Sequence, residues 1–456
     1  MKLYRLIYIL ALMLILCAGC DKFLEEKSDK ALNIPALLED YQALLDNSVV
    51  VNGYSVASGE MSADNYYITT ASYNSLNLDY ARNIYRWAGA KIDGAGNRDW
   101  ELCYSQIYTA TVVLDGINKI RRNGENQTQW DNVKGQALTL RAYRYLDAVT
   151  VWGKAYDEAT AHEDLGIPLR QTTDFNERSV RVSVQETYNE IIKTLKEAIP
   201  LLPMQGIAAT RANRRMAYAG LSRVYLFMGK FKEAELYADS ALQINDKLLD
   251  FNKLVDNSLP YVAQEVNEEM VCYMSMNNIG QLLDQNRHCI DTVLFDSFLD
   301  NDLRKRVFFQ GNSSGSFFFK GNYTGIFNIM FSGMTNAELY LTRAECYARK
   351  GKIIEAMDDL NKVLKSRMDN KKTFIPFAAS SKDEAMAIIL SERRKELMFR
   401  GIRWPDIKRL NKDGANMILT RIIDGKTYTL PPNDNRYALP IPEDVIQLSG
   451  MPQNPQ

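Results

Sequence analysis

The sequence is poor in the side chains that build metal centres and disulfide frameworks. Its 456 residues include only two histidines, His162 and His288, and six cysteines. The four cysteines beyond residue 20 are widely separated, whereas zinc sites and disulfide-dense folds need closely spaced ligands. We therefore expect no metal and no cofactor. A bond between Cys272 and Cys289, across a loop, is left open by the sequence.

Catalytic signatures and a strong charge of either sign are also missing. The formal net charge is −1, and a nucleic-acid binder would need a basic face, so we expect no nucleic-acid partner. The chain has no HExxH motif and no Walker loop, and carboxylate pairs are too common in it to indicate a glycosidase. The sequence therefore predicts a protein that is not an enzyme and has no catalytic residues.

The apolar run near the amino terminus, residues 6–16, is too short to span a membrane. It follows two basic residues and precedes the triplet AGC ending at Cys20, which matches the bacterial lipobox. We expect a signal peptide over residues 1–19, a lipid on Cys20 and a short polar tether over residues 20–33. Cys17 stands where the lipobox usually has leucine, and plain secretion after a cut at the same place is the alternative.

A helical hairpin over residues 213–245 is the unit from which the chain is built. Its two helical patterns are joined at Gly229, which supplies the left-handed backbone that ends the first helix. Small residues on one face of the second helix let it lie close against the first. The apolar residues at helical spacing are Ala217, Leu221, Val224 and Met228, followed by Ala234, Ala238 and Ala241. With aromatic residues flanking the turn, this pattern is typical of a tetratricopeptide repeat.

A second copy of this hairpin occupies residues 338–364, with Gly351 in the place of Gly229. One hairpin cannot bury both of its faces, so repeated copies imply stacked neighbours. Further helical patterns cover residues 99–121, 130–152, 183–199 (ended by Pro200) and 381–399. The expected fold is mainly α, with about four tetratricopeptide-like helix pairs, a few short strands, and a scaffold formed by residues 99–245 and 337–410.

Two long segments, 49–98 and 251–333, interrupt the helical pattern. The chain holds 25 tyrosines, so a window of this size should contain about two, and residues 54–87 contain six. The second segment is rich in glycine and carries three successive phenylalanines at 317–319, of which at least one should be exposed. Long irregular segments are commonly functional, so we expect these two to face a ligand or a partner.

Five pieces of the chain together resemble the SusD/RagB family of outer-membrane nutrient-binding lipoproteins. They are CDKFLE at 20–25, LRAYRY at 140–145 running to Trp152-Gly153, ELYLTRAE at 338–345, ERRKELMF at 392–399 with GIRWPDIKR at 401–409, and LPIP at 439–442 with QNP at 453–455. They occur in the family's order and cover almost the whole chain after the leader. One departure is Pro405, where the family usually has an aromatic residue.

The resemblance implies a single domain over residues 20–456, lipid-anchored in the outer membrane and facing the cell exterior. Family members form a lid on a SusC-like TonB-dependent barrel and capture an oligosaccharide, or in some members a peptide, for import. The repeats mainly face the barrel, and the irregular segments bear the ligand. A non-catalytic tetratricopeptide scaffold for other envelope proteins is a further alternative.

Sugars bind to flat aromatic faces flanked by side chains that hydrogen-bond their hydroxyl groups. In the family, an acidic residue and a tryptophan of the amino-terminal region often contact sugar, which makes Asp64 and Trp87 the first candidates. The other candidate ligand-binding residues are Asn65, Tyr66, Tyr67, Tyr73, Arg82, Arg287 and Tyr323. On this interpretation, Trp87→Ala should weaken ligand binding without altering folding.

Structural roles compete with these assignments. The aromatic residues of the first irregular segment can instead pack that segment onto the helices. His288 is expected to be a hydrogen-bonded surface residue. The charged run 392–396 fits an amphipathic helix whose exposed stripe makes ion pairs, rather than a catalytic set.

Overall fold

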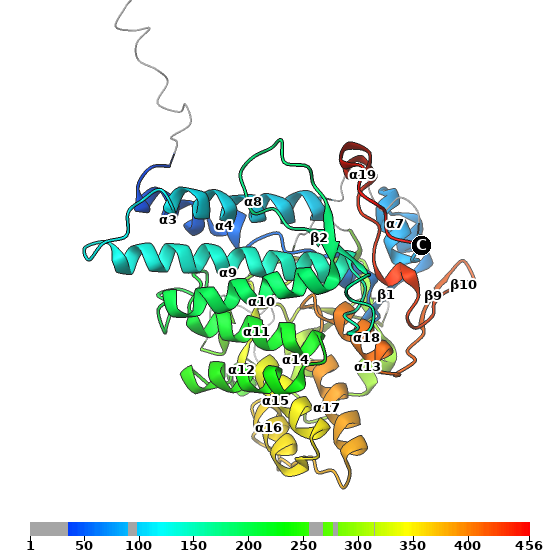
Figure 1. Cartoon of the computed structure of the whole chain (residues 1–456). Helices are drawn as coiled ribbons and strands as arrows, with labels where there is room; N and C mark the ends of the chain where they lie inside the picture. The colour runs from blue at the N-terminus through cyan, green and yellow to red at the C-terminus, as the bar shows by residue number, and fades with distance from the viewer. Residues whose placement is uncertain (1–34, 90–97, 255–267, 277–280, 314) are drawn as a thin grey trace, which may run out of the picture.

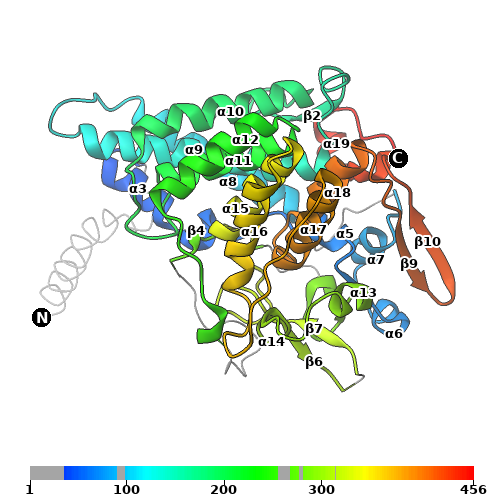
Figure 2. The same ribbon diagram turned by 90° about the horizontal axis from the view of Figure 1, so that it is seen from below.

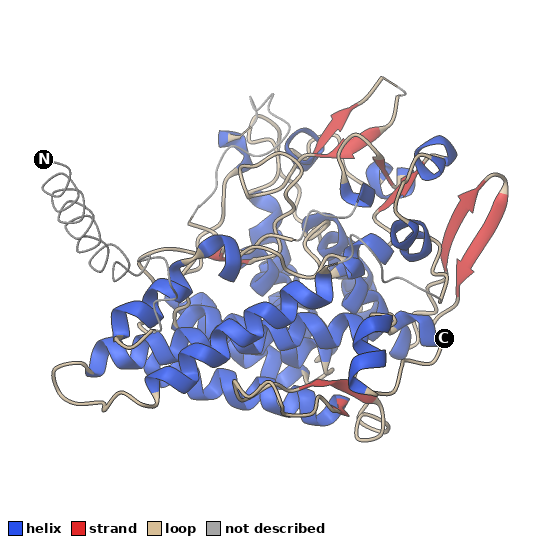
Figure 3. Cartoon of the chain, turned by 90° about the horizontal axis from the view of Figure 1, so that it is seen from above, coloured by secondary structure: helices blue, strands red, loops and turns tan. Residues whose placement is uncertain are grey.

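A computed structural model describes residues 35–89, 98–254, 268–276, 281–313 and 315–456 (Figure 1). The expected signal peptide, the lipid site at Cys20 and the tether lie outside the described residues. Antiparallel helices stack side by side across the molecule, and the strands between and beside them are short (Figure 3). Within the described ranges we find no helix that combines the length and the apolar character needed to cross a bilayer.

The first long hairpin pairs α8 (Asp99–Ile117) with α9 (Gln127–Trp152), as the sequence predicts. The short helix α3 (Leu38–Asp46) packs against both. A glycine allows this contact, because a Cβ on Gly116 would lie 2.1 Å from the ring of Tyr41.

The next helices continue the stack. α10 (Val184–Leu201) packs on α9 and on α11 (Arg214–Phe227), which in turn pairs with α12 (Phe231–Ile244). Ser183 starts α10 with a capping box. Its hydroxyl accepts a hydrogen bond from the backbone N–H of Glu186, and the Glu186 carboxylate accepts one from the backbone N–H of Ser183. The helix runs one residue past Pro200, where the sequence predicts its end, and stops at Leu201, so the proline lies in the last turn and not in the middle of the helix.

The repeat predicted after residue 337 is α15 (Asn336–Arg349) with α16 (Ile353–Lys365). Both tetratricopeptide turns carry the expected left-handed glycine, with φ of 71° at Gly229 and 78° at Gly351. Two more helices, α17 (Lys382–Glu396) and α18 (Arg403–Lys412), close this side of the molecule. The mainly α, tetratricopeptide-like fold is therefore confirmed.

The two irregular segments contain more regular structure than the sequence predicts. The first folds into α4 (Ser48–Val51), α5 (Ser58–Ser62), β1 (Tyr66–Ile68), α6 (Thr70–Asn74) and α7 (Asp79–Tyr85). The second contains η1 (Phe251–Lys253), β4 (Met270–Cys272), η2 (Gln281–Leu283), β5 (His288–Ile290), α13 (Thr292–Asp296), α14 (Arg304–Phe308), β6 (Phe309–Gly311), β7 (Phe317–Phe319) and β8 (Met334–Thr335). Helices of one turn show almost no period, which explains why the first segment looks non-helical in sequence.

The strands form separate two-stranded antiparallel ladders. The pairs are β1 with β5, β4 with β8, β6 with β7, β2 (Leu165–Pro168) with β3 (Arg181–Ser183), and β9 (Leu419–Ile423) with β10 (Lys426–Leu430). The β9–β10 hairpin lies beside α6, so the carboxy-terminal part of the chain meets the first irregular segment (Figure 2).

The charged run of α17 is buried rather than exposed, which corrects the prediction of a solvent-facing stripe. Arg367 contacts Glu396 at 2.8 Å and Glu269 at 2.9 Å, and Arg304 contacts Glu392 at 2.6 Å. Buried charges are tolerated only when they are paired and hydrogen-bonded, and these groups satisfy one another. The cluster therefore joins α17 to the second irregular segment as part of the scaffold.

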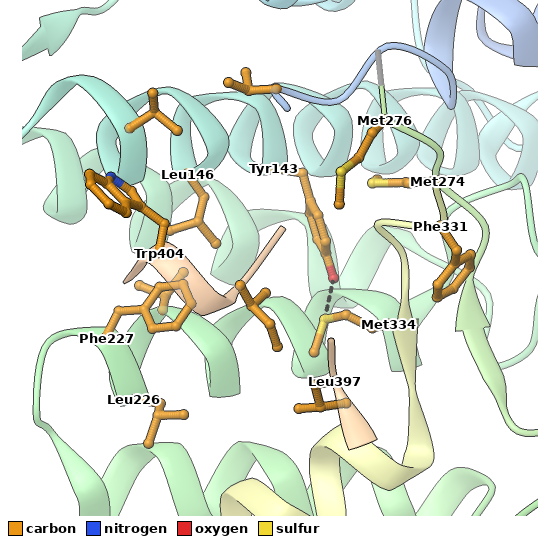
Figure 4. Close-up of a cluster of buried hydrophobic side chains, with 14 of the residues drawn as sticks. Tyr143, Leu146, Leu226, Phe227, Met274, Met276, Phe331, Met334, Leu397 and Trp404 are labelled. Carbon is orange, nitrogen blue, oxygen red and sulfur yellow. Dashed lines mark hydrogen bonds between the residues drawn. The ribbon is translucent and has the colours of Figure 1, made fainter. Parts of the chain in front are cut away.

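Apolar packing links the helices to the segment around β8. Tyr143 of α9 donates a hydrogen bond from its hydroxyl to the carbonyl of Met216 (2.9 Å) and lies 3.4 Å from the sulfur of Met334 (Figure 4). The fully buried indole of Trp404 belongs to the same apolar cluster. All four cysteines among the described residues are buried and free, so Cys272 and Cys289 do not pair.

The carboxy-terminal tail is fixed by one buried amide. Asn454 donates from Nδ2 to the carbonyls of Trp152 (2.8 Å) and Leu439 (2.7 Å) and accepts from Arg181 at Oδ1 (2.8 Å). Residues near the end of the chain are thereby tied to the end of α9 and to β3.

Candidate functional site

The two irregular segments meet in the β1–β5 ladder. Tyr66 lies opposite Ile290, Tyr67 opposite Cys289 and Ile68 opposite His288. The candidate residues of the two segments, which are more than 200 positions apart in sequence, are therefore brought to the same part of the molecule.

His288 holds this ladder to β7 from within, and it is buried rather than at the surface as predicted. Its Nε2 accepts from the backbone N–H of Phe319 (3.0 Å), so Nδ1 carries the proton and donates to the carbonyl of Asp284 (2.9 Å). Burial lowers the pKa of His288 to about 4. The neutral imidazole is thus a structural crosslink.

A polar surface joins the segments on the outside, and we name it the junction surface: Tyr67, Asn77, Arg82, Gln281 and Arg287. Gln281 donates to the Asn77 side chain at 2.6 Å and accepts from its backbone N–H at 3.3 Å. Arg287 donates to the hydroxyl of Ser75 at 2.8 Å.

Arg82 completes the junction surface from α7. It contacts the exposed carboxylate of Asp79 at 2.7 Å, and it also donates to the carbonyl of Leu76. Arg82 and Arg287 therefore hold the loop between α6 and α7 from two sides. Both remain half-buried, as does Tyr67, so each of these candidates keeps surface that a ligand can reach.

Two other aromatic candidates of the first segment, Tyr66 and Trp87, surround a cation of the protein itself together with Tyr85, which the sequence did not single out. The guanidinium of Arg421, from β9, lies 4.5 Å from the ring centre of Tyr85, 5.1 Å from that of Tyr66 and 5.2 Å from that of Trp87. It donates to the backbone carbonyl of Tyr66 at 2.7 Å and to that of Ala63. We name Tyr66, Tyr85, Trp87 and Arg421 the arginine cage, which is a cation–π arrangement.

The arginine cage is closed to solvent. Trp87 is 3% exposed, and its indole N–H donates to the carbonyl of Ser62 at 3.0 Å. Tyr66 is 1% exposed, and its hydroxyl donates to the carbonyl of Met61. The prediction that Tyr66 and Trp87 contact a ligand therefore conflicts with their burial, because their faces and polar atoms already have partners in the protein.

Asp64, the acidic first candidate, is engaged by two arginines. Arg403 binds both carboxylate oxygens (2.7 and 2.8 Å), and Arg394 lies 3.3 Å from one of them. Burial by itself would raise the pKa of Asp64, but the Arg403 guanidinium, helped by Arg394, holds it well below its usual range. This carboxylate joins the first segment to the helices α17 and α18.

The remaining candidates are also buried. Asn65 donates to the carboxylate of Glu60 at 3.1 Å, and burial raises the pKa of Glu60 to about 7. Tyr73 is 8% exposed. Tyr323, with no exposed surface, lies under the guanidinium of Arg400, 4.4 Å from the ring centre. Within the described ranges, no group of histidine, cysteine, aspartate and glutamate side chains is placed to hold a metal ion.

Two family profiles match the chain in succession. One, described as "Starch-binding associating with outer membrane", covers residues 22–226, and the other, described as "SusD family", covers residues 334–456. The chain belongs to the SusD family.

Known members are distant in sequence but similar in fold. SusD-like protein P38 of Formosa agariphila is 23% identical over 69% of this chain and 72% of its own length. Among solved structures, a SusD superfamily protein of Bacteroides thetaiotaomicron superposes with a TM-score of 0.74 at 19% identity, covering 92% of this chain and all of its own (100%). A SusD-like carbohydrate-binding protein of Bacteroides vulgatus has a TM-score of 0.69 at 19% identity (91% and 97% covered).

One further neighbour is described as a laminarin-binding SusD-like protein. It superposes with a TM-score of 0.63 at 17% identity and covers 91% of this chain and 97% of its own. At these identities the superpositions establish the fold, not the ligand.

Sequence reasoning on this SusD-family protein missed the residues that occupy the buried candidates. Arg421 and Arg403 lie more than 300 residues after the tyrosines and the aspartate that they bind. No local pattern predicts such a contact. A buried arginine needs several hydrogen-bond acceptors and can also pack on aromatic faces. The excess of tyrosines in the first segment is therefore the one sequence signal that is consistent with a buried arginine there.

Proposed function

We propose that this SusD-family protein captures an oligosaccharide at the cell surface and delivers it to a SusC-like TonB-dependent barrel. Membership of a family whose profile is described as starch-binding and associated with the outer membrane is the observation that carries the proposal. The names of the solved neighbours, one carbohydrate-binding and one laminarin-binding, point in the same direction.

We place the captured glycan at the junction surface. Recognition of a sugar rests on side chains that exchange hydrogen bonds with hydroxyl groups, and an aromatic face strengthens it. Tyr67 offers the aromatic face, and Asn77, Arg82, Gln281 and Arg287 offer amide and guanidinium groups. Contacts that already hold these side chains in place lower the entropic cost of binding.

The protein would act by binding alone, anchored through a lipid on Cys20 outside the described residues. A lipid chain stabilises membrane attachment by about 0.8 kcal/mol for each buried CH₂ group, so a multi-chain anchor is effectively permanent. The helical stack would face the barrel, as in the family, and leave the irregular segments free for the ligand.

Binding of the mature protein to starch, laminarin and a peptide digest, measured by isothermal titration, tests the proposal. We expect one polysaccharide class to bind, and Tyr67→Ala or Arg287→Ala to weaken that binding. Tyr108→Ala and Arg178→Ala, which remove exposed residues of the same types elsewhere, are the matched controls. Binding of peptides alone would favour the peptide role. Co-purification with a barrel and no soluble ligand would favour a scaffold.

A further inference from the structure

A second concave site lies away from the junction surface. It is a cleft of about 340 Å³ between the loop that follows α9 (154–164), helix α18 and the turn 433–437. Pockets that hold small ligands range from about 300 to 1,000 Å³, so the cleft can hold a ligand of one or two sugar rings. None of the sequence-predicted candidates lines it.

The charged groups at the rim of the cleft already have partners. Lys154 contacts Asp164 at 2.8 Å, and Lys412 contacts Asp413 at 2.6 Å. Asp434, on the opposite wall, is held by Arg436 at 2.8 Å. The remaining rim carboxylate, Asp157, accepts from the backbone N–H of Ala159 at 3.0 Å. An anionic ligand would have to displace one of the ion pairs, and a cationic ligand would find only this one unpaired carboxylate among the lining residues, so the charge pattern favours a neutral ligand.

Lys408 lies at the buried floor of the cleft and is occupied as well. Its Nζ donates to the carbonyls of Gly153 (2.6 Å) and Thr150 (2.8 Å), which end helix α9. Burial lowers its pKa to about 7. The two carbonyls take two of the three donors of the ammonium form, and the lowered pKa leaves much of the side chain uncharged near neutral pH, so it contributes little to anion binding.

Neutral amide groups remain available on the turn 433–437. Asn435 is exposed, and its side chain makes no hydrogen bond to any part of the chain that the structure describes. The side chain of Asn433 donates to the carbonyl of Asn411 (3.3 Å), which leaves its own carbonyl oxygen for a ligand.

The turn that carries these amides is rigidly built. Asp434 accepts from the backbone N–H of Arg436 at 3.0 Å as well as from its guanidinium, and thereby caps η3 (Asn435–Tyr437). The ring of Tyr437, buried against Trp404 with ring centres 4.8 Å apart, supports the turn from beneath. The backbone of the turn and the Asn433 side chain are therefore held before a ligand arrives, which lowers the entropic cost of binding, and only the Asn435 side chain remains to be ordered.

We propose that this cleft is a second carbohydrate site, which binds one hexopyranose unit of an uncharged glycan through Asn433 and Asn435. The ligand class rests on the proposed function, whereas the place and the neutrality of the ligand follow from the cleft itself. Two sites on one chain would let it hold a long polysaccharide at two points and so raise its avidity.

Saturation-transfer NMR on the mature protein tests the site with three probes, the methyl pyranosides of glucose, galactose and mannose. We expect at least one probe to receive saturation from the wild type. Because the junction surface is also proposed to bind sugar, the cleft variants are made in the Tyr67→Ala/Arg287→Ala background, where the remaining transfer comes from the cleft. There Asn435→Trp, which fills the cleft, should abolish that signal. Asn433→Gly removes an amide at a residue with φ of 59°, which glycine adopts without strain, and should weaken binding about tenfold. Arg178→Ala is the control, and thermal unfolding checks that each variant is folded.

No saturation of any of the three probes in the Tyr67→Ala/Arg287→Ala background, or a signal there that persists in both cleft variants, would overturn the second site. The single variants separate this inference from the proposed function. If both sites bind sugar, Arg287→Ala and Asn435→Trp each lower the wild-type transfer. If the junction surface is the only sugar site, Arg287→Ala removes the transfer, whereas the cleft variants leave it intact. If the cleft alone binds sugar, transfer depends on Asn435 and Arg287→Ala leaves it unchanged.

Discussion

The arginine cage and the junction surface both draw on the first irregular segment and on the same kinds of side chain, yet one is closed to solvent and the other is open. In the cage, Tyr66, Tyr85 and Trp87 enclose Arg421, and no face is left for a ligand. At the junction surface, Arg82 and Arg287 are tied to a loop but stay partly open to solvent.

The difference teaches that aromatic richness marks a place where a cation or a sugar can be held, without saying which. A cage closes when the chain supplies its own cation, because cation–π contacts and carbonyl hydrogen bonds offset the desolvation of a guanidinium. The junction surface stays open because its arginines make hydrogen bonds to the protein on one side and face solvent on the other. Variants in the two regions should therefore have separable effects on stability and on binding.

The largest effect is expected for Trp87→Ala. Removing a buried indole should lower the free energy of unfolding by about 3–5 kcal/mol, contrary to the sequence-based expectation of an unaltered fold. Urea denaturation measures the loss. Ile422→Ser, at an exposed position of β9 beside Arg421, is the control and should stay within about 0.5 kcal/mol of the wild type. An unchanged Trp87→Ala stability, with weakened glycan binding, would return Trp87 to the ligand site.

Acid should weaken the second irregular segment through His288, which links β5 to β7. Its pKa is lowered to about 4 in the fold, so the unfolded chain takes up the proton first as pH falls. The stability from the neutral imidazole is fully present above about pH 6.5 and should fall by about 3 kcal/mol once the pH is below 4.

The measurement is the free energy of unfolding between pH 4 and 7, compared with that of His288→Gln. We expect the variant to be less stable at pH 7 and to lose this part of the pH slope. His162→Gln, at the exposed histidine, should keep the wild-type slope. Equal slopes in the wild type and His288→Gln would exclude the crosslink.

Asp64→Asn should cost about 2 kcal/mol of stability, because it leaves Arg403 and Arg394 without their carboxylate. The pair is partly exposed, so the loss is smaller than for a fully buried ion pair. Since the depressed pKa of Asp64 means that its stabilisation is lost as acid protonates it, the variant should also be less sensitive to strong acid. Thermal unfolding at pH 7 and at pH 3 checks both points. Glycan binding should be unchanged at pH 7, and a large loss there would make Asp64 a ligand contact.

The smallest effect on stability is expected at the junction surface. Arg287→Ala should change the free energy of unfolding by less than about 0.5 kcal/mol, while it weakens glycan binding about tenfold through the loss of a charged hydrogen-bond donor. Titration and denaturation of the same sample measure the two quantities. Equal and small effects on both would move the glycan site away from this surface.

The repeats were predictable because a tetratricopeptide hairpin is a local object. The spacing of small residues and the left-handed Gly229 and Gly351 are properties of a few turns of chain, and the structure has both. The family pieces are local as well. The short helices of the first irregular segment were missed because one helical turn has too few residues to show a period.

Contacts between distant segments could not be predicted in the same way. The run 392–396 has the composition of an exposed charged stripe, and only the arrival of Arg304 and Arg367 from other elements makes its burial possible. The same holds for Asp64 and the arginine cage. In each case the polarity of a residue was known, but its partner was set by tertiary packing.

The sequence by itself determined the helical repeats, the family and the two segments that differ from the repeats, because periodicity and composition are written along the chain. The tertiary structure alone decided which aromatic residues are buried around Arg421 and which polar residues stay at the surface. The physical reason is that desolvation and ion pairing depend on what comes within a few ångströms in space, and the partners are separated by hundreds of residues in sequence.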